Sequence, residues 1–205
     1  MSKNVRFQRD FFLQPTLAVA QNLIGQRLVF VDKKKRRLSG FITETEAYVG
    51  TKDLACHARV GKTRRNAVMW GPAGHAYVYF TYGVHWMLNF VTEKEGFPCA
   101  VLIRGLWPDQ GVDEMLQKRP VAKIENLTNG PAKLCQALGI NGSWKAVDLC
   151  REESLLFVEE GIPIKDDHLT TGPRVGLNKV PEPWKSIPWR FLVDPSEIKN
   201  WESIT

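Results

Sequence analysis

Two glutamates and a tyrosine occupy every second position of the segment 44–48, which reads Glu-Thr-Glu-Ala-Tyr. Two apolar residues at 41–42 precede it, which is typical of a β-strand, and alternate side chains of a strand share one face. Glu44, Glu46 and Tyr48 would then lie together. If their face is buried, two carboxylates leave water, at a cost of several kcal/mol unless they are paired. Proteins retain such groups for a partner or for a reaction.

Two further residues have the chemistry to act with these glutamates. Arg104 follows the apolar strand 101–103, where a guanidinium needs a partner of opposite charge, and His57 lies in the glycine-rich stretch 50–74. An arginine beside a carboxylate keeps it ionised and oriented, as a general base that activates water requires. On residue types alone, a structural Glu–Arg pair in a sheet and a hydrogen-bonded core histidine are the simpler interpretations.

An aromatic run from Tyr77 to Phe90 predicts a β-hairpin. Its two flanks are rich in β-branched and aromatic residues, and Tyr82-Gly83 between them suits a tight turn. A bulky ring at the tip of a hairpin needs a packing partner or a ligand. One such ligand is a stack of bases, into which protein side chains insert as wedges.

Length and composition limit the class of protein. The chain has 205 residues, with 28 Lys and Arg against 22 Asp and Glu, so its formal net charge is +6. This suits a polyanionic partner without requiring one. The four cysteines lie far apart, without a pattern for zinc or for a disulfide framework, and we expect free thiols. There is no leader-like segment and no apolar stretch long enough to cross a membrane, so we expect a soluble intracellular protein.

The remaining patterns favour one α+β domain over residues 1–205, with a curved, mainly antiparallel sheet, flanking helices and a protruding hairpin. No repeat or clear linker interrupts it. The stretch 50–74 has no strong period and indicates a functional loop region. The expected helices are 16–23, 113–118 and one from about 131 to a stop at Gly139; the expected strands are 27–32, 38–48, the two arms of the hairpin, 100–103 and 190–193; and the tail from Thr171 is expected to wrap the core irregularly.

Basic residues in two places leave alternatives open. The loop 33–37 is wholly basic, and it is either a solvated hairpin tip or a phosphate contact. The start of the helix near 131 and Lys133 offer a phosphate site as well, although most helix starts hold only water.

Several short blocks, taken in order, give this chain a resemblance to the alkyladenine (3-methyladenine, methylpurine) DNA glycosylase family. The blocks span almost the whole chain, from about Leu17 to Val193, and agreement of so many in order is far more specific than a single motif. They are Glu44-Thr-Glu46-Ala-Tyr48, Ala55-Cys-His57, Arg65-Asn66, Tyr77-Val-Tyr79 with Tyr82-Gly83, Asn89, Val101-Leu-Ile-Arg104 and the run from Asn129 to Leu138.

The resemblance implies a base pocket and a wedge. Tyr82 stands where relatives insert a tyrosine into the gap left by a flipped nucleotide. Tyr48 and His57 on one side, with Tyr79 on the other, hold the places of the rings that stack the purine, and such stacking is worth roughly 1–3 kcal/mol per base. Asn89 matches the position that screens the pocket edge against the exocyclic amine of normal guanine.

The resemblance also implies hydrolysis without metal or cofactor. Glu46 matches the residue that deprotonates a water aimed at the anomeric carbon, and Arg104 the residue that helps fix that carboxylate. The products would be a free base and an abasic site. The implied partner is double-stranded DNA with damaged purines, bound by a monomer at no membrane, and we expect a cytoplasmic, nucleoid-associated protein of bacterial type.

Contacts to the DNA backbone are assigned to a further group of residues. Lys62 adds another basic side chain in the same loop region. The group is Thr63, Arg64, Arg65, Gly83, Lys133 and Arg174.

Residues 84–87 depart from the usual family pattern, which leaves pocket volume and lesion preference open among 3-methyladenine, 7-methylguanine, hypoxanthine and ethenoadenine.

Two other functions stay as alternatives. A non-catalytic nucleic-acid-binding module would use the aromatic hairpin but gives no reason for pairing Glu46 with Arg104. A hydrolase of free nucleosides would use the carboxylate and the stacking rings but has no use for a ring at a hairpin tip.

Overall fold

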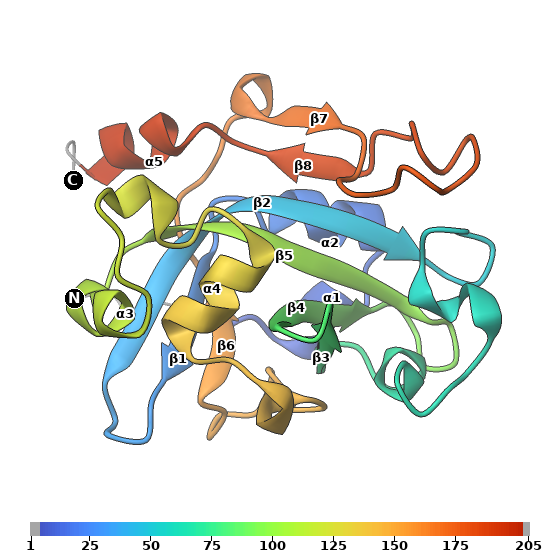
Figure 1. The fold of residues 1–205 in the computed structure, drawn as a ribbon, viewed down its shortest axis with the longest axis horizontal. Helices are drawn as coiled ribbons and strands as arrows, with labels where there is room; N and C mark the ends of the chain where they lie inside the picture. Colours follow the sequence, from blue (N-terminus) through green and yellow to red (C-terminus); the bar gives the residue numbers. More distant parts are fainter. Residues whose placement is uncertain (1–4, 203–205) are drawn as a thin grey trace.

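Eight antiparallel strands form one sheet in a computed structural model that describes residues 5–202 (Figure 1). The strand order is β3-β4-β5-β2-β1-β6, and β8 pairs with both β2 and β7. The strands are β1 (Arg27–Val31), β2 (Arg37–Val49), β3 (Ala76–Thr81), β4 (His85–Thr92), β5 (Cys99–Pro108), β6 (Leu156–Glu159), β7 (Thr170–Gly172) and β8 (Arg190–Leu192). With helices around it, this sheet confirms the predicted α+β class. The two ends of the predicted 1–205 domain lie outside the described residues.

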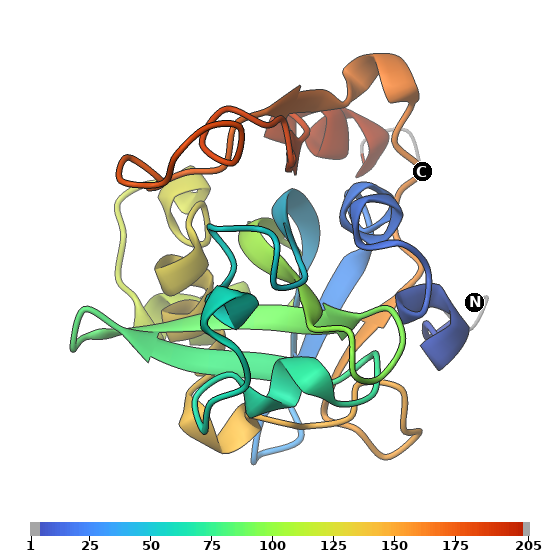
Figure 2. The ribbon, with the colours of Figure 1, turned by 90° about the vertical axis from the view of Figure 1, so that its right-hand side faces the viewer.

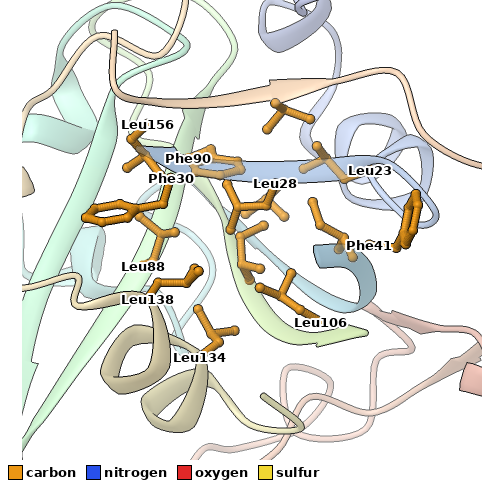
Figure 3. Packing of buried hydrophobic residues seen from close by; sticks show 14 of the residues in the cluster. Leu23, Leu28, Phe30, Phe41, Leu88, Phe90, Leu106, Leu134, Leu138 and Leu156 are labelled. Carbon is orange, nitrogen blue, oxygen red and sulfur yellow. The ribbon is translucent and has the colours of Figure 1, made fainter. Parts of the chain in front are cut away.

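Within residues 5–202, five α-helices flank the sheet. They are α1 (Arg9–Phe12), α2 (Thr16–Asn22), α3 (Val112–Lys118), α4 (Pro131–Leu138) and α5 (Pro195–Glu202). Helix α4 contacts β4 and β5, and its Leu134 and Leu138 pack beside Leu88 and Leu106 in the core (Figure 3). Helix α2 contacts β2, where Thr45 donates a hydrogen bond to the carbonyl of Ala20.

Strand β2 is the longest strand and positions much of the site. One edge of β2 pairs with β1 over residues 37–41 and with β8 over residues 44–46, and the other edge pairs with β5. The register with β5 shifts on both sides of Glu44. This irregularity lets Arg104 of β5 approach two glutamates of β2, because the ladder does not separate them at regular spacing.

The predicted aromatic hairpin is confirmed as β3 and β4, paired from Ala76 and Phe90 at its base to Thr81 and His85 near its tip. It protrudes from the body of the molecule, as Figure 2 shows at the left. The C-terminal wrap between β7 and β8 projects on the same side of the molecule in that view.

Other predicted elements lie where the sequence places them but differ in length from the prediction. The strand expected at 100–103 is part of the longer β5, and the loop region 50–74 contains two 3₁₀ turns, His57–Val60 and Ala67–Trp70. Helices α1 and α5 and strands β6 and β7 lie outside the predicted elements. Helix α1 and strand β6 have four residues each and β7 has three, too few to show a periodic pattern. All four cysteines are free, as predicted.

Candidate active site

A cavity of about 380 Å³ opens beside the base of the aromatic hairpin. This volume lies within the range of small-molecule sites. Strands β2, β3, β4 and β5 contribute to its lining, as do the loop before His57, the start of α4 and the C-terminal wrap. The lining residues that matter below are Tyr48, His57, Tyr77, Tyr79, Tyr82, Asn89, Arg104 and Val175.

Glu46 lies beside this cavity on β2, and no part of its side chain is exposed. One carboxylate oxygen, Oε2, accepts a hydrogen bond of 2.8 Å from the hydroxyl of Tyr48, its neighbour on the same strand face. The other, Oε1, accepts one of 2.6 Å from the backbone N–H of Val175. Each oxygen therefore has a fixed donor, and the carboxylate is held in one orientation.

Arg104 is shared between two carboxylates. Its Nε lies 2.9 Å from Oε1 of Glu44, to which it donates a hydrogen bond, and 3.3 Å from Oε1 of Glu46. Glu44 also lies 3.4 Å from a terminal nitrogen of Arg190 on β8. The expected pairing of Arg104 with Glu46 is thus an ion pair at a slightly longer distance, and the directed hydrogen bond goes to Glu44.

Burial dominates the electrostatics of this carboxylate. It raises the pKa of Glu46 above that of a free glutamate, although Arg104, the Val175 N–H and the Tyr48 hydroxyl each favour the ionised form. A glutamate with a raised pKa is a stronger base once it has lost its proton. Burial also places the pKa of the Tyr48 hydroxyl well above its usual range, so Tyr48 remains a hydrogen-bond donor at neutral pH.

The rings of His57 and Tyr79 pack edge to face. Their centroids are 4.6 Å apart at an interplanar angle of 78°, and His57 Nδ1 lies 2.9 Å from the hydroxyl of Tyr77. Burial, with Arg65 and Arg59 nearby, lowers the pKa of His57 to about 4, so the imidazole is neutral. A purine between two ring faces needs roughly 7 Å, twice a van der Waals separation. In this arrangement His57 and Tyr79 do not form the two faces of a slot.

Asn89 belongs to the cavity wall at the base of the hairpin. Its side chain is 4% exposed, and its Nδ2 donates a hydrogen bond of 3.0 Å to the carbonyl of Tyr77 on the paired strand. This bond fixes the orientation of the amide against the cavity, as a steric screen requires.

The hairpin tip presents its ring to solvent. Tyr82 is 87% exposed and has a φ of 52°, and the following Gly83 has a φ of 69°. Positive φ at two consecutive residues is the geometry of the tight turns that connect antiparallel strands. Val84 beside them is 66% exposed. The fold therefore holds an aromatic ring outside the core in a backbone conformation unfavourable for tyrosine.

Most of the residues expected at the DNA backbone lie on the surface. Thr63, Arg64 and Arg65 are exposed on a loop that Asn66 ties down, since its Nδ2 donates to two backbone carbonyls of the same region. The Arg65 guanidinium lies 5.2 Å over the ring of Tyr79, at the cavity. Lys133 donates to the Asn129 side chain at the start of α4.

Arg174 does not fit the expected phosphate contact. Its side chain is completely buried and forms a two-pronged ion pair with Asp53, with N–O distances of 2.5 and 2.9 Å. The guanidinium also lies 4.7 Å from the Tyr48 ring centroid. Its charge is already neutralised inside the protein, which corrects the expectation of a surface contact.

Two functional contributors have no clear sequence signal. Val175 acts through its backbone N–H, which every residue except proline carries, so side-chain reasoning does not identify it. Asp53 lies in the loop region between β2 and the first 3₁₀ turn, where an acid is ordinary. Only the ion pair with Arg174 marks it.

Two kinds of feature are absent from residues 5–202. Those residues contain no group of three or more His, Cys, Asp or Glu side chains placed to hold a metal ion. Among the same residues, no helix has both the length and the apolar character needed to cross a membrane.

Comparison with known proteins gives consistent matches along the chain. A family model described as methylpurine-DNA glycosylase matches residues 10–197. A protein of Prosthecochloris aestuarii named putative 3-methyladenine DNA glycosylase is 47% identical, over 85% of this chain and 83% of its own length. Proteins with the same name from Methanocella arvoryzae and Rickettsia felis are 45% and 40% identical, over 89% and 94% of this chain and 90% and 96% of their own lengths.

Proposed function

Since this chain belongs to the methylpurine-DNA glycosylase family, we propose that it flips alkylated or deaminated purines out of duplex DNA and hydrolyses their N-glycosidic bond with a water activated by Glu46. The family makes the protein a DNA glycosylase of DNA repair, with damaged DNA as its substrate. The observation that carries the mechanism is a completely buried carboxylate, fixed by two donors, beside a cavity of suitable size.

The chemical step needs one proton acceptor. Glu46 accepts a proton from water as the water oxygen bonds to C1′ of the deoxyribose. The bond from C1′ to the purine nitrogen breaks, and its electron pair leaves with the base. A purine that alkylation has made cationic leaves as a neutral molecule, which lowers the barrier to departure. A neutral purine such as hypoxanthine leaves as an anion, which then takes up a proton from solvent. General-base assistance of this kind contributes roughly 10²–10⁴-fold to the rate.

Arg104 supports this step by charge. Its Nε is 3.3 Å from Glu46, so it favours the ionised carboxylate at neutral pH against the effect of burial. Because Glu44 takes the directed hydrogen bond from Arg104, the Glu46 oxygens retain lone pairs for the proton of a water.

Aromatic faces around the cavity receive the base. Tyr48 and Tyr79 line the cavity from different strands, and a ring with a cationic character is attracted to such faces. His57 and Tyr79 pack edge to face, so we expect one of these rings, or Arg65 above Tyr79, to shift when a purine enters. Asn89 screens the cavity edge against the amine of normal guanine.

Tyr82 stabilises the flipped state from the hairpin tip, where it also contributes to the lining of the cavity. Its exposed ring at the end of a protruding hairpin suits insertion between base pairs, where side-chain wedges occupy the space that the base leaves. The exposed residues Thr63, Arg64 and Gly83 and the half-buried Lys133 are the proposed contacts to the DNA backbone.

The decisive experiment compares two glutamates of one strand. Glu46→Gln removes the base and should reduce single-turnover excision of hypoxanthine or 7-methylguanine from a duplex by at least about 10²-fold, while lesion binding is retained. Glu44→Gln alters a side chain that also pairs with Arg104 but is 21% exposed, and it should reduce excision less. Excision by Glu46→Gln at the wild-type rate would refute the mechanism, and hydrolysis of free nucleosides but not of duplex lesions would favour a nucleoside hydrolase.

A further inference from the structure

The buried ion pair of Arg174 and Asp53 joins the C-terminal wrap to strand β2. One terminal nitrogen of Arg174 donates to Asp53 Oδ2 and to the carbonyl of Ala47, and the other donates to Asp53 Oδ1 and to the carbonyl of Trp184. Both side chains are completely buried. Four hydrogen bonds from one guanidinium therefore fix the start of the wrap, its later turn and the strand that carries Glu46.

We propose that Arg174 and Asp53 are positioning residues for the glycosylase reaction, holding the Val175 N–H and the Tyr48 ring in the geometry that orients Glu46. This inference rests on the proposed function of Glu46. Neither residue lines the cavity, and the polar groups of the pair are taken up by each other and by the backbone, so both act through their neighbours and not on the substrate.

The first path runs through the backbone of the wrap. Val175 follows Arg174 directly, and its N–H donates the 2.6 Å hydrogen bond to Glu46 Oε1. Val175 itself is 45% exposed, so its side chain gives the wrap little anchorage. The adjacent Arg174 side chain is buried and anchors this part of the wrap. Without that anchor, the Val175 N–H can move away from Glu46 Oε1.

The second path runs through the ring of Tyr48. The Arg174 guanidinium lies 4.7 Å from the ring centroid of Tyr48 and 5.1 Å from that of Trp189. Tyr48 is thus supported by a cation on one side, and its hydroxyl donates to Glu46 Oε2. The Arg174 guanidinium therefore supports both donors to the Glu46 carboxylate, the Val175 N–H and the Tyr48 hydroxyl.

Asp53 extends the same control to the loop that carries Ala55 and His57, which also line the cavity. Its carboxylate accepts hydrogen bonds from the N–H groups of Val49 and Ala55, and its carbonyl accepts one from Cys56. These bonds shape the turn that leads from β2 to His57. The wrap and this loop thus depend on one pair of charges.

Energetics favour a positional role over a stabilising one. Two charges removed from water regain little net free energy from each other, so a buried pair is weak evidence for stability alone. The pair instead specifies where its attached segments lie. A displacement of about 1 Å at a reacting group costs on the order of 100-fold in rate.

The test uses Asp53→Asn and Arg174→Lys in the full chain, at a temperature where unfolding curves show each variant to be folded. Single-turnover excision of hypoxanthine from a duplex should fall about 10- to 100-fold in both. Affinity for undamaged duplex should change less than about twofold, because neither residue touches the surface. Asp148→Asn is the matched control: it breaks another Arg–Asp pair, with Arg9 at 2.6 Å, and should leave the excision rate unchanged.

A pH profile separates positioning from simple loss of stability. Loss of the Val175 donor raises the pKa of Glu46 further, so the acidic limb of the excision rate should move to higher pH in both variants, and a merely structural role leaves it in place. The charged and titratable groups around this carboxylate are Glu44 and Tyr48 of β2, Tyr79 of β3, Arg104 of β5 and Arg190 of β8, and all are retained in both variants.

A third variant covers the case in which the ion-pair variants do not fold. Val175→Pro removes the N–H without leaving a buried charge, and it should show the same loss of rate and the same shift of the acidic limb. Wild-type rate and limb in Val175→Pro, or in folded Asp53→Asn, would overturn the inference. If Glu46→Gln still excises the base, the proposed function itself fails, so the two failures are distinguishable.

Discussion

Replacing Tyr82 by asparagine should stabilise the protein and weaken its binding to damaged DNA. Tyr82 has a φ of 52° and is 87% exposed, so its ring contributes little packing while its backbone is in the left-handed region. That region costs a residue with an ordinary side chain roughly 1–2 kcal/mol, whereas asparagine tolerates it. Asparagine followed by glycine is also the preferred pair for a two-residue hairpin turn.

The effects of this substitution on stability and on DNA binding have opposite signs. We expect a gain of about 1 kcal/mol in the free energy of unfolding, or about 2–4 °C in Tm for a chain of this length. Loss of a ring that stacks against a base costs roughly 1–3 kcal/mol of binding free energy, which is about a 5- to 150-fold weaker Kd for lesion duplex. A residue selected for the fold would not show this combination.

The assay measures Kd for a hypoxanthine duplex by fluorescence anisotropy in a Glu46→Gln background, so that no product forms. Ala146→Asn serves as the control, since Ala146 is exposed and has a φ of 66° on a different loop. It should show a similar gain in stability with an unchanged Kd. A large loss of stability in Tyr82→Asn would mean that the ring supports the fold, and an unchanged Kd would mean that it does not enter the duplex; either result refutes the reasoning.

Four further results are expected. Because burial raises the pKa of Glu46, the excision rate should fall on acidification with a midpoint above that of an exposed glutamate, and a midpoint at the exposed value would contradict a buried base. For the same reason the ionised carboxylate costs stability above its folded pKa, so Glu46→Gln should be at least as stable as wild type in thermal unfolding at pH 7, with the difference disappearing as pH falls through that pKa. With a pKa of about 4, His57 should stay neutral between about pH 5 and 8, and ring-nitrogen NMR shifts that titrate near 6.5 would disprove this. Arg64→Ala should lower the log-log salt slope of duplex binding by about 0.9, whereas an unchanged slope would remove Arg64 from the phosphate contacts.

Local chemistry explains what the sequence predicted well. A strand alternates its side chains with a period of two, so Glu46 and Tyr48 could be placed on one face, and the structure joins them by a hydrogen bond. A tight turn needs positive φ, so Tyr82-Gly83 could be placed at the tip of a hairpin. Both inferences involve residues no more than a few positions apart, where covalent geometry restricts the alternatives.

Packing between distant segments decided the contacts that the sequence did not predict. The expected phosphate contact Arg174 is instead buried against Asp53, 121 positions earlier in the chain, because a guanidinium on an irregular segment is placed by whichever acid the fold brings to it. The Val175 N–H reaches Glu46 across 129 positions, and a backbone donor leaves no mark in the side-chain pattern.

The sequence by itself therefore determined which chemical groups the site contains: the Glu46 carboxylate, the aromatic rings and the exposed Tyr82. The tertiary structure decided how they are held: which of two glutamates takes the hydrogen bond from Arg104, how His57 packs against Tyr79, and which buried pair anchors the C-terminal wrap. The physical reason is that side-chain identity and strand period are local properties, whereas burial, pKa and ion pairing depend on segments that only the folded chain brings together.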